Sequence, residues 1–279
     1  MKNIILRILS GIVYIAVIVI PILLYDNSAV AYLIVFPLFV VLGVNELIHM
    51  AKDEASESWL LTMVDWAGGV GLFLAFYMLN DTPRSVSMWV LPLAVYLLVR
   101  CILQLYRPRQ NALRSLERSF FAILYVALPI SLLNNIIAVS APRILLAMFI
   151  FIWINDTGAF CVGSLIGKHP LFERISPHKT WEGFFGGLLA CVGIAYAGYL
   201  WLNEFFEVPD LLTWMGLSVV VSVSATFGDL VESLIKRTVH VKDSGNLIPG
   251  HGGVLDRIDS LLLAAPAVLI FLIIMNYNH

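Results

Sequence analysis

Long runs of apolar residues fill most of the chain, and short polar connections separate them. A helix needs about 20 predominantly apolar residues to cross the hydrocarbon core of a bilayer. Runs of about this length fall at residues 4–24, 28–48, 59–79, 85–105, 119–139, 143–163, 182–202, 211–235 and 258–276. The pattern therefore predicts an all-α, polytopic integral membrane protein with about nine transmembrane helices.

The amino-acid composition also favours an integral membrane protein. Hydrophobic residues make up 60% of the chain and charged residues 13%, whereas soluble proteins carry roughly 25% charged residues. The three cysteines, Cys101, Cys161 and Cys191, fall inside apolar runs without CxxC spacing, so we expect them to be buried and unpaired. The chain has no HExxH, Walker A, GxGxxG or GxSxG motif, which argues against zinc, soluble nucleotide-binding and acyl-transfer scaffolds.

The distribution of basic residues predicts the orientation of the spans. With nine spans, 15 of the 17 Lys and Arg residues fall on one side, and only Arg84 and Arg143 fall on the other. Positive charge marks the cytoplasmic side of a membrane protein. We therefore expect a cytoplasmic N-terminus, an external C-terminus and a location in the cell membrane, which is the inner membrane if the source is bacterial.

Acidic residues inside or beside the spans gather toward the predicted cytoplasmic side. These residues are Glu46, Asp65, Asp156, Glu182, Asp229, Glu232, Asp256 and Asp259. Charges at membrane depth are costly and usually mark a polar cavity, so the pattern predicts a pocket open to the cytoplasm. An ion-coupled transporter would instead spread acids toward the middle of the membrane and show an inverted repeat, neither of which is found.

The densest polar segment is SLIKRTVHVKDSGNLIPGHGGVLDRID, which runs over 27 residues from Ser233 to Asp259. Asp256 and Asp259 are three residues apart, and Asp229 precedes Ser233 and Lys236 at helical spacing. Carboxylates suit a hard cation such as Mg²⁺, and Lys and Arg suit phosphate. The glycine turn at residues 250–253 lets backbone N–H groups approach an anion at the start of the next helix. The segment predicts a phosphate and metal site at a membrane face.

Three other segments leave alternatives open. In SPHKTWEG, Ser176, Lys179 and Thr180 either grip a phosphate or form a helix start with Ser176 as the N-cap. Asp156 either serves the substrate or metal site or makes a buried structural hydrogen bond. Residues 107–120 form either an interfacial helix or a solvated loop. The GxxxG pairs at 163/167 and 183/187 favour helix packing over phosphate binding.

Well over a dozen positions between Ser233 and Asp259 resemble the signature of the phosphatidate cytidylyltransferases, the CDP-diacylglycerol synthases. The matching positions are Ser233, Ile235, Lys236, Arg237, Lys242, Asp243, Gly245, Ile248, Pro249, His251, Gly252, Gly253, Val254, Asp256, Arg257, Ile258 and Asp259. The resemblance extends back through Asp156-Thr157-Gly158-Ala159 and SPHKTWEG, and so covers about the C-terminal half of the chain.

The resemblance implies a Mg²⁺-dependent transfer of CMP from CTP to phosphatidic acid, and it leaves open a second, monovalent cation such as K⁺. It implies Asp229, Asp256 and Asp259 as metal ligands and Asp229, Lys236, Arg237 and Asp256 as catalytic residues. The expected substrate-binding residues are Asp156, Ser176, Lys179, Thr180, Ser233, Lys242, His251, Gly252, Gly253 and Arg257.

The expected partners are CTP, phosphatidic acid and the lipid bilayer, with no nucleic acid and with a homodimer as one option. We expect residues 1–140 to form a scaffold of about five spans with lipid access, and residues 141–279 to form the catalytic region. The main alternative function is a CTP-dependent lipid kinase on a related scaffold, which would use the same metal and basic residues.

Overall fold

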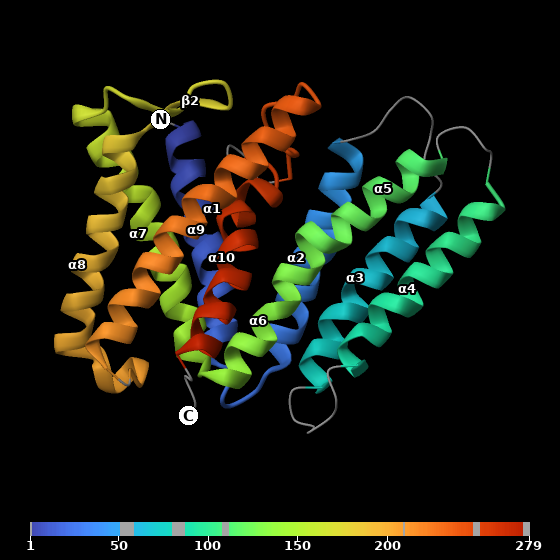
Figure 1. Cartoon of the computed structure of the whole chain (residues 1–279), viewed down its shortest axis with the longest axis horizontal. Coiled ribbons are helices and arrows are strands. Elements are labelled where there is room, and N and C mark those ends of the chain that lie inside the picture. Colours follow the sequence, from blue (N-terminus) through green and yellow to red (C-terminus); the bar gives the residue numbers. More distant parts are fainter. Residues whose placement is uncertain are drawn as a thin grey trace. The chain divides into compact units, whose positions relative to one another are not determined.

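A computed structural model describes residues 2–50, 59–79, 87–107, 112–208, 210–247 and 252–275 (Figure 1). The elements are α1 (Lys2–Leu23), α2 (Val30–Met50), α3 (Trp59–Leu79), α4 (Ser87–Leu105), α5 (Ala112–Ala122), η1 (Ile123–Ala127), α6 (Leu128–Val139), α7 (Pro142–Ile166), β1 (Pro170–Phe172), β2 (Ser176–Thr180), α8 (Trp181–Phe206), α9 (Leu211–Thr238) and α10 (Leu255–Ile274). Across these described residues the only sheet is the antiparallel β1–β2 pair. The predicted all-α class is confirmed, with one short hairpin added.

Seven described helical stretches are long and apolar enough to cross a membrane. They are Val30–Met50, Trp59–Met78, Ala112–Val139, Pro142–Ile166, Trp181–Phe206, Leu211–Thr238 and Leu255–Ile274. Two shorter apolar helices, Leu9–Leu23 and Val90–Leu105, coincide with the first and fourth predicted spans. The polytopic architecture is therefore confirmed, while the count of nine spans and their orientation stay predictions.

Of residues 107–120, those at 108–111 lie outside the described residues. From Ala112 onward the segment is helical, so the loop interpretation is wrong there, and an interfacial position stays a prediction. From Ala112 the chain is helical, and α5 continues through the π-helical turn η1 into α6. Together these elements make one helix of 28 residues, Ala112–Val139. The polar pattern around Arg114 and Arg118 belongs to the first turns of a span that becomes continuously apolar only after Ser119.

The chain packs as two units, which we describe separately. The first comprises Met1–Ala138 with Asp243–Arg257, and the second comprises Val139–Lys242 with Ile258–His279. In the first unit α2, α3, α4 and the α5–η1 helix pack on one another. In the second unit α7, α8 and α9 lie side by side (Figure 1). The functional division of the chain at residue 140 stays a prediction.

Small residues allow the backbones of α7 and α8 to approach closely. A Cβ atom on Gly163 would lie 3.5 Å from the Cα of Gly183, and one on Gly187 would lie 2.7 Å from the carbonyl oxygen of Asn155. Gly167 is the C-cap of α7. The prediction that these glycines serve helix packing is confirmed for Gly163, Gly183 and Gly187, whereas a Cβ on Gly167 would meet Gly163 of its own helix and the side chain of Thr180. The three cysteines are free as expected, but only Cys191 is buried.

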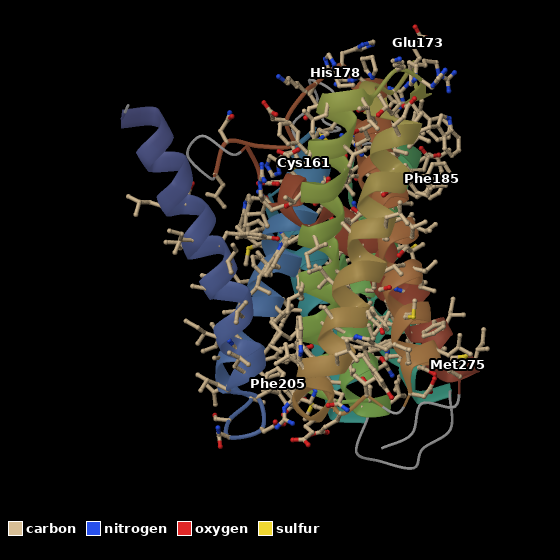
Figure 2. All side chains as sticks on the ribbon, turned by 90° about the vertical axis from the view of Figure 1, so that its left-hand side faces the viewer. Cys161, Glu173, His178, Phe185, Phe205 and Met275 are labelled. Atoms are coloured by element: carbon tan, nitrogen blue, oxygen red, sulfur yellow. The ribbon has the colours of Figure 1, made fainter. Side chains whose placement is uncertain are left out.

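The hairpin ends where α8 begins, and Figure 2 shows its residues Glu173 and His178 at the opposite end of α8 from Phe205. Thr180 is the N-cap of α8, because its hydroxyl accepts a hydrogen bond from the N–H of Gly183 at 3.1 Å. Ser176 lies at the start of β2, so its interpretation as the N-cap is wrong. The helical pattern begins four residues later than the Ser-Pro pair suggested.

The N-cap of α9 is Asp210. Its carboxylate accepts from the N–H of Thr213 at 2.8 Å and from the hydroxyl of the same residue at 2.6 Å. These hydrogen bonds favour the ionised form and hold the pKa of Asp210 below its usual value. The cap fixes the end of α9 that is remote from its acidic and basic residues.

A buried polar network joins α3, α4 and α5 in the first unit. The guanidinium of Arg100 donates to Asp65 at 3.2 Å, to Gln104 at 2.8 Å and to the hydroxyl of Ser115 at 2.8 Å. Asp65 also accepts from the hydroxyl groups of Tyr96 and Ser119, each at 2.7 Å. The side chains of Arg100 and Asp65 are 0% and 2% exposed. Both charges therefore depend on partners that three helices supply.

We expect Arg100→Ala to destabilise the folded protein strongly, because it leaves the Asp65 carboxylate buried without its cation. Breaking one partner of a buried ion pair costs about 3–5 kcal/mol. Arg143→Ala is the matched control, since the Arg143–Glu207 pair is exposed and such pairs contribute roughly 0–1 kcal/mol. Thermal unfolding of both variants in detergent tests this ranking, and equal losses would contradict it.

Candidate functional site

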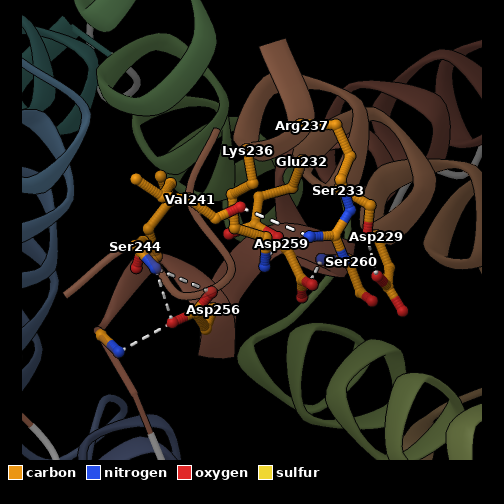
Figure 3. Close-up of polar contacts among 12 residues, drawn as sticks. Asp229, Glu232, Ser233, Lys236, Arg237, Val241, Ser244, Asp256, Asp259 and Ser260 are labelled. Carbon is orange, nitrogen blue, oxygen red and sulfur yellow. Dashed lines mark hydrogen bonds and ion pairs between the residues drawn. The ribbon is translucent and has the colours of Figure 1, made fainter. Parts of the chain in front are cut away.

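Three acidic side chains from two helices meet in the second unit. Asp229 and Glu232 lie one turn apart on α9, and Asp259 lies on α10. Each offers a carboxylate oxygen, and the three oxygen atoms lie within 4.8 Å of one another. Figure 3 shows these side chains together with Ser233 and Lys236 of α9. We call Asp229, Glu232 and Asp259 the acidic cluster.

Gly228 allows α9 and α10 to approach each other beside the acidic cluster. A Cβ atom at this position would lie 2.7 Å from the carbonyl oxygen of Asp259 and 3.0 Å from the Cα of Ser260. Both atoms belong to the backbone and cannot rotate away. Because Gly228 directly precedes Asp229, the close approach brings acids from both helices together.

Two lysines lie against the acidic cluster. The ammonium group of Lys179, on β2, pairs with the carboxylate of Asp229. The ammonium group of Lys236 pairs with Glu232, one turn earlier on α9. Glu232 is fully buried, whereas the side chain of Asp229 is 33% exposed. The cluster thus combines a buried member, Glu232, with a partly exposed one, Asp229, which pairs with the hairpin.

Other polar contacts hold this part of the second unit in place. Arg237 donates to the carbonyl oxygen of Ile175, in the hairpin, at 3.5 Å and to that of Val241 at 3.4 Å. Asn155 of α7 is buried, and its amide joins α9 by accepting from Ser222 at 2.6 Å and donating to Thr226 at 3.1 Å. Asn155 thus has a structural role, while its neighbour Asp156 is exposed.

The donor set of the acidic cluster fits a hard divalent cation. Mg²⁺ takes oxygen ligands, usually one or two carboxylates together with water and substrate phosphates. Three carboxylates face two paired lysines, and the side chain of Asp229 is 33% exposed, so it is accessible to water or to phosphate oxygens. The cluster can therefore hold Mg²⁺ while presenting it to an anionic ligand.

Two further carboxylates hold the start of α10 within the first unit. Glu46 of α2 accepts from the N–H groups of Val254 and Leu255, both at 2.8 Å. Asp256 accepts from the N–H groups of Gly253 at 2.8 Å and Ser244 at 3.0 Å. Residues 250 and 251 of the glycine turn lie outside the described residues, and the N–H of Gly253 binds the protein's own carboxylate at Asp256. The expected approach of this turn to a bound anion stays a prediction.

The predicted site residues lie on five parts of the chain. Asp229, Ser233, Lys236 and Arg237 are on α9, Asp256, Arg257 and Asp259 on α10, Ser176, Lys179 and Thr180 on β2, Asp156 on α7, and Lys242, Gly252 and Gly253 in the α9–α10 connection. His251 lies outside the described residues. Within the described residues, the structure groups Asp229 and Asp259 with Glu232, and Asp256 is not a member of this group.

Sequence reasoning did not assign Glu232 to the metal site. Its signal was nevertheless present, because Glu232 follows Asp229 by three residues and precedes Lys236 by four. That spacing places all three on one helical face. The roles predicted for the other residues, including metal binding by Asp256, stay predictions.

The fold and the site thus define a polytopic membrane protein with a cluster of acids and lysines suited to cation and phosphate binding. A model of the cytidylyltransferase family matches residues 5–275, which is nearly the whole chain. The chain therefore belongs to the cytidylyltransferase family.

Individual relatives match over a shorter length. Proteins named phosphatidate cytidylyltransferase from Staphylococcus epidermidis and Staphylococcus haemolyticus are each 44% identical, over 131 and 133 residues, and a protein of that name from Staphylococcus aureus is 43% identical over 129 residues. These matches cover 46–47% of this chain and 48–49% of the relatives. The chain thus spans about half the length of the curated relatives it matches.

Gly228→Ala should weaken cation binding, because the added methyl group forces α9 and α10 apart at the acidic cluster. We expect the affinity for Mn²⁺, an oxygen-preferring substitute for Mg²⁺, to fall about 10-fold or more in an electron paramagnetic resonance titration. Gly193→Ala is the matched control, since a Cβ on Gly193 meets nothing within 4 Å. Unchanged Mn²⁺ binding by a folded Gly228→Ala protein would remove the cluster as the cation site.

Proposed function

We propose that this protein is a phosphatidate cytidylyltransferase, which joins CTP and phosphatidic acid to give CDP-diacylglycerol and pyrophosphate. The observation that carries the proposal is the acidic cluster with its two lysines, in a chain that belongs to the cytidylyltransferase family. The names of the staphylococcal relatives support the same activity. Apolar helices suit a substrate whose acyl chains stay in the bilayer.

The proposed reaction is a displacement at the α-phosphorus of CTP. A phosphate oxygen of phosphatidic acid forms a bond to this phosphorus, the bond from the α-phosphorus to the bridging oxygen of the β-phosphate breaks, and pyrophosphate leaves. Both reactants are polyanions, so charge repulsion and positioning dominate the barrier. The nucleophile is already ionised near neutral pH, and no general base is required.

Different residues of the site would bind the cation and the phosphate groups. Asp229, Glu232 and Asp259 would hold Mg²⁺, which supplies neutralisation of the triphosphate charge. Lys179 and Lys236 pair with these carboxylates, so they can turn toward phosphate oxygens once a cation takes over the negative charge. Asp256 remains a proposed further ligand, and a monovalent cation such as K⁺ is an additional option.

The membrane location follows from the two substrates. CTP arrives from water, whereas phosphatidic acid diffuses within the bilayer. We propose that the site faces the cytoplasm of the cell, in line with the excess of basic residues in the loops predicted on that side. The proposed partners are CTP, phosphatidic acid and the bilayer lipids, and a homodimer is compatible with this arrangement.

Labelled CTP separates this activity from that of a lipid kinase. With purified protein, phosphatidic acid and Mg²⁺, we expect CTP labelled at the α-phosphorus to label lipid and CTP labelled at the γ-phosphorus to yield labelled pyrophosphate. ATP, GTP and UTP serve as controls for base selectivity. If the lipid captures the γ label and no pyrophosphate forms, the protein is a kinase and the proposal fails.

Asp229→Asn should lower CTP turnover by at least about 100-fold, because a direct ligand of the cation is lost, and raised Mg²⁺ should restore part of it. Asp256→Asn should also nearly abolish turnover while leaving membrane insertion intact. Glu204→Gln is the matched control, since it changes an exposed acid in the second unit outside the cluster. Full activity of Asp229→Asn at limiting Mg²⁺ would contradict the metal assignment.

A further inference from the structure

We propose that Glu46, on α2, is a positioning residue that holds Asp256 in its working orientation. The inference rests on the proposed function, in which Asp256 belongs to the reaction site. About 200 residues separate Glu46 from the segment that it contacts, and it lies far outside the Ser233–Asp259 segment. All the groups in the following argument belong to the first unit.

The carboxylate of Glu46 is almost completely buried, with 8% of the residue exposed, and binds the chain on both sides of the glycine turn. Oε1 accepts from the N–H of Val254 at 2.8 Å. Oε2 accepts from the N–H of Leu255 at 2.8 Å and from the hydroxyl of Ser244, also at 2.8 Å. The N–H groups of Val254 and Leu255 lie at the start of α10, where an anion is favoured by the helix dipole.

Asp256 also accepts hydrogen bonds from this segment. Its Oδ2 accepts from the N–H of Gly253 at 2.8 Å and from the N–H of Ser244 at 3.0 Å. Ser244 thus donates its hydroxyl to Glu46 and its backbone N–H to Asp256. The consecutive N–H groups of residues 253, 254 and 255 are divided between the two carboxylates. We call this arrangement the double-carboxylate clamp.

The glycines around the clamp leave room for the two carboxylates, which a side chain at these positions would fill. A Cβ on Gly245 would lie 2.8 Å from Oε1 of Glu46, and one on Gly252 would lie 2.5 Å from Oδ2 of Asp256. Gly252 also has a φ of +81°, which L-residues with a side chain rarely adopt. A Cβ on Gly253 would collide with both Ser244 and Glu46. The absence of side chains at these positions therefore allows the backbone to pass close to the two carboxylates.

The clamp needs a carboxylate at position 46, and an amide cannot replace it. Glu46 accepts three hydrogen bonds on two oxygens. A glutamine has only one acceptor oxygen, and its NH₂ group would face at least one N–H donor. Glu46→Gln should therefore release part of the 244–255 segment and with it the partners that orient Asp256.

The test combines hydrogen exchange with kinetics on the full-length protein in detergent. We expect Glu46→Gln to speed amide exchange in peptides covering residues 243–257 and to lower kcat for CDP-diacylglycerol formation about 10- to 100-fold, the range typical of groups that orient a ligand. The KM for CTP should change much less. Ser244→Ala, which removes only the hydroxyl donor to Glu46, should give a smaller effect of the same kind.

Asp65→Asn is the matched control, because it removes a buried carboxylate from the same unit outside the clamp. It should lower thermal stability while leaving exchange in 243–257 and kcat close to wild type. If Glu46→Gln speeds exchange but kcat is unchanged, Glu46 only caps the helix and the inference is wrong. It is also wrong if exchange in this segment does not change.

Two further outcomes are distinguishable. If Glu46→Gln does not fold, Ser244→Ala decides by the same two measurements. If the wild-type protein forms no CDP-diacylglycerol, the proposed function fails and the catalytic part of this inference fails with it. The exchange experiment then still decides whether Glu46 holds the 243–257 segment.

Discussion

A carboxylate buried among apolar helices must have a partner, and this constraint shapes the polar interior of the protein. An isolated charge in such surroundings is very costly. The chain meets the requirement in three ways. Asp65 faces the guanidinium of Arg100, Glu46 binds backbone N–H groups at the start of α10, and the acidic cluster is paired with Lys179 and Lys236. The third arrangement sets three carboxylates against two lysines, so it favours an added cation.

A structural group of charged residues differs from a functional one in two respects. One is how completely other protein groups satisfy its hydrogen bonds, and the other is how far its side chains are exposed. The Asp65–Arg100 network is closed, because Arg100 is fully buried and side chains of α3, α4 and α5 complete its hydrogen bonds. The acidic cluster has a buried member, Glu232, and a partly exposed member, Asp229, whose partner Lys179 is itself 26% exposed. A buried charge held beside a partly exposed one can exchange one partner for another, which a phosphate and metal site requires.

The sequence allowed the helices and the shared helical face of Asp229, Ser233 and Lys236 to be predicted, because both depend on local spacing. Apolar runs define the spans, and the spacing of Asp229, Ser233 and Lys236 predicts one helical face. The hairpin was missed because strands as short as β1 have no recognisable period and SPHKT resembles a helix start. The role of Glu46 was missed because its partners lie about 200 residues away and only packing brings them together.

The glycines show most clearly where a prediction from the local sequence pattern fails. A glycine turn before a helix predicts N–H groups that are open to a ligand, and the same pattern also serves a chain that must fold around its own carboxylates. Here the space beside Gly245 and Gly252 is filled by Glu46 and Asp256. Gly228 likewise has no side chain, which allows α10 to approach Asp229. Since an added methyl group would meet a carboxylate or a backbone atom at each position, the packing around the acids is sufficient to account for these glycines, whether or not a ligand also binds there.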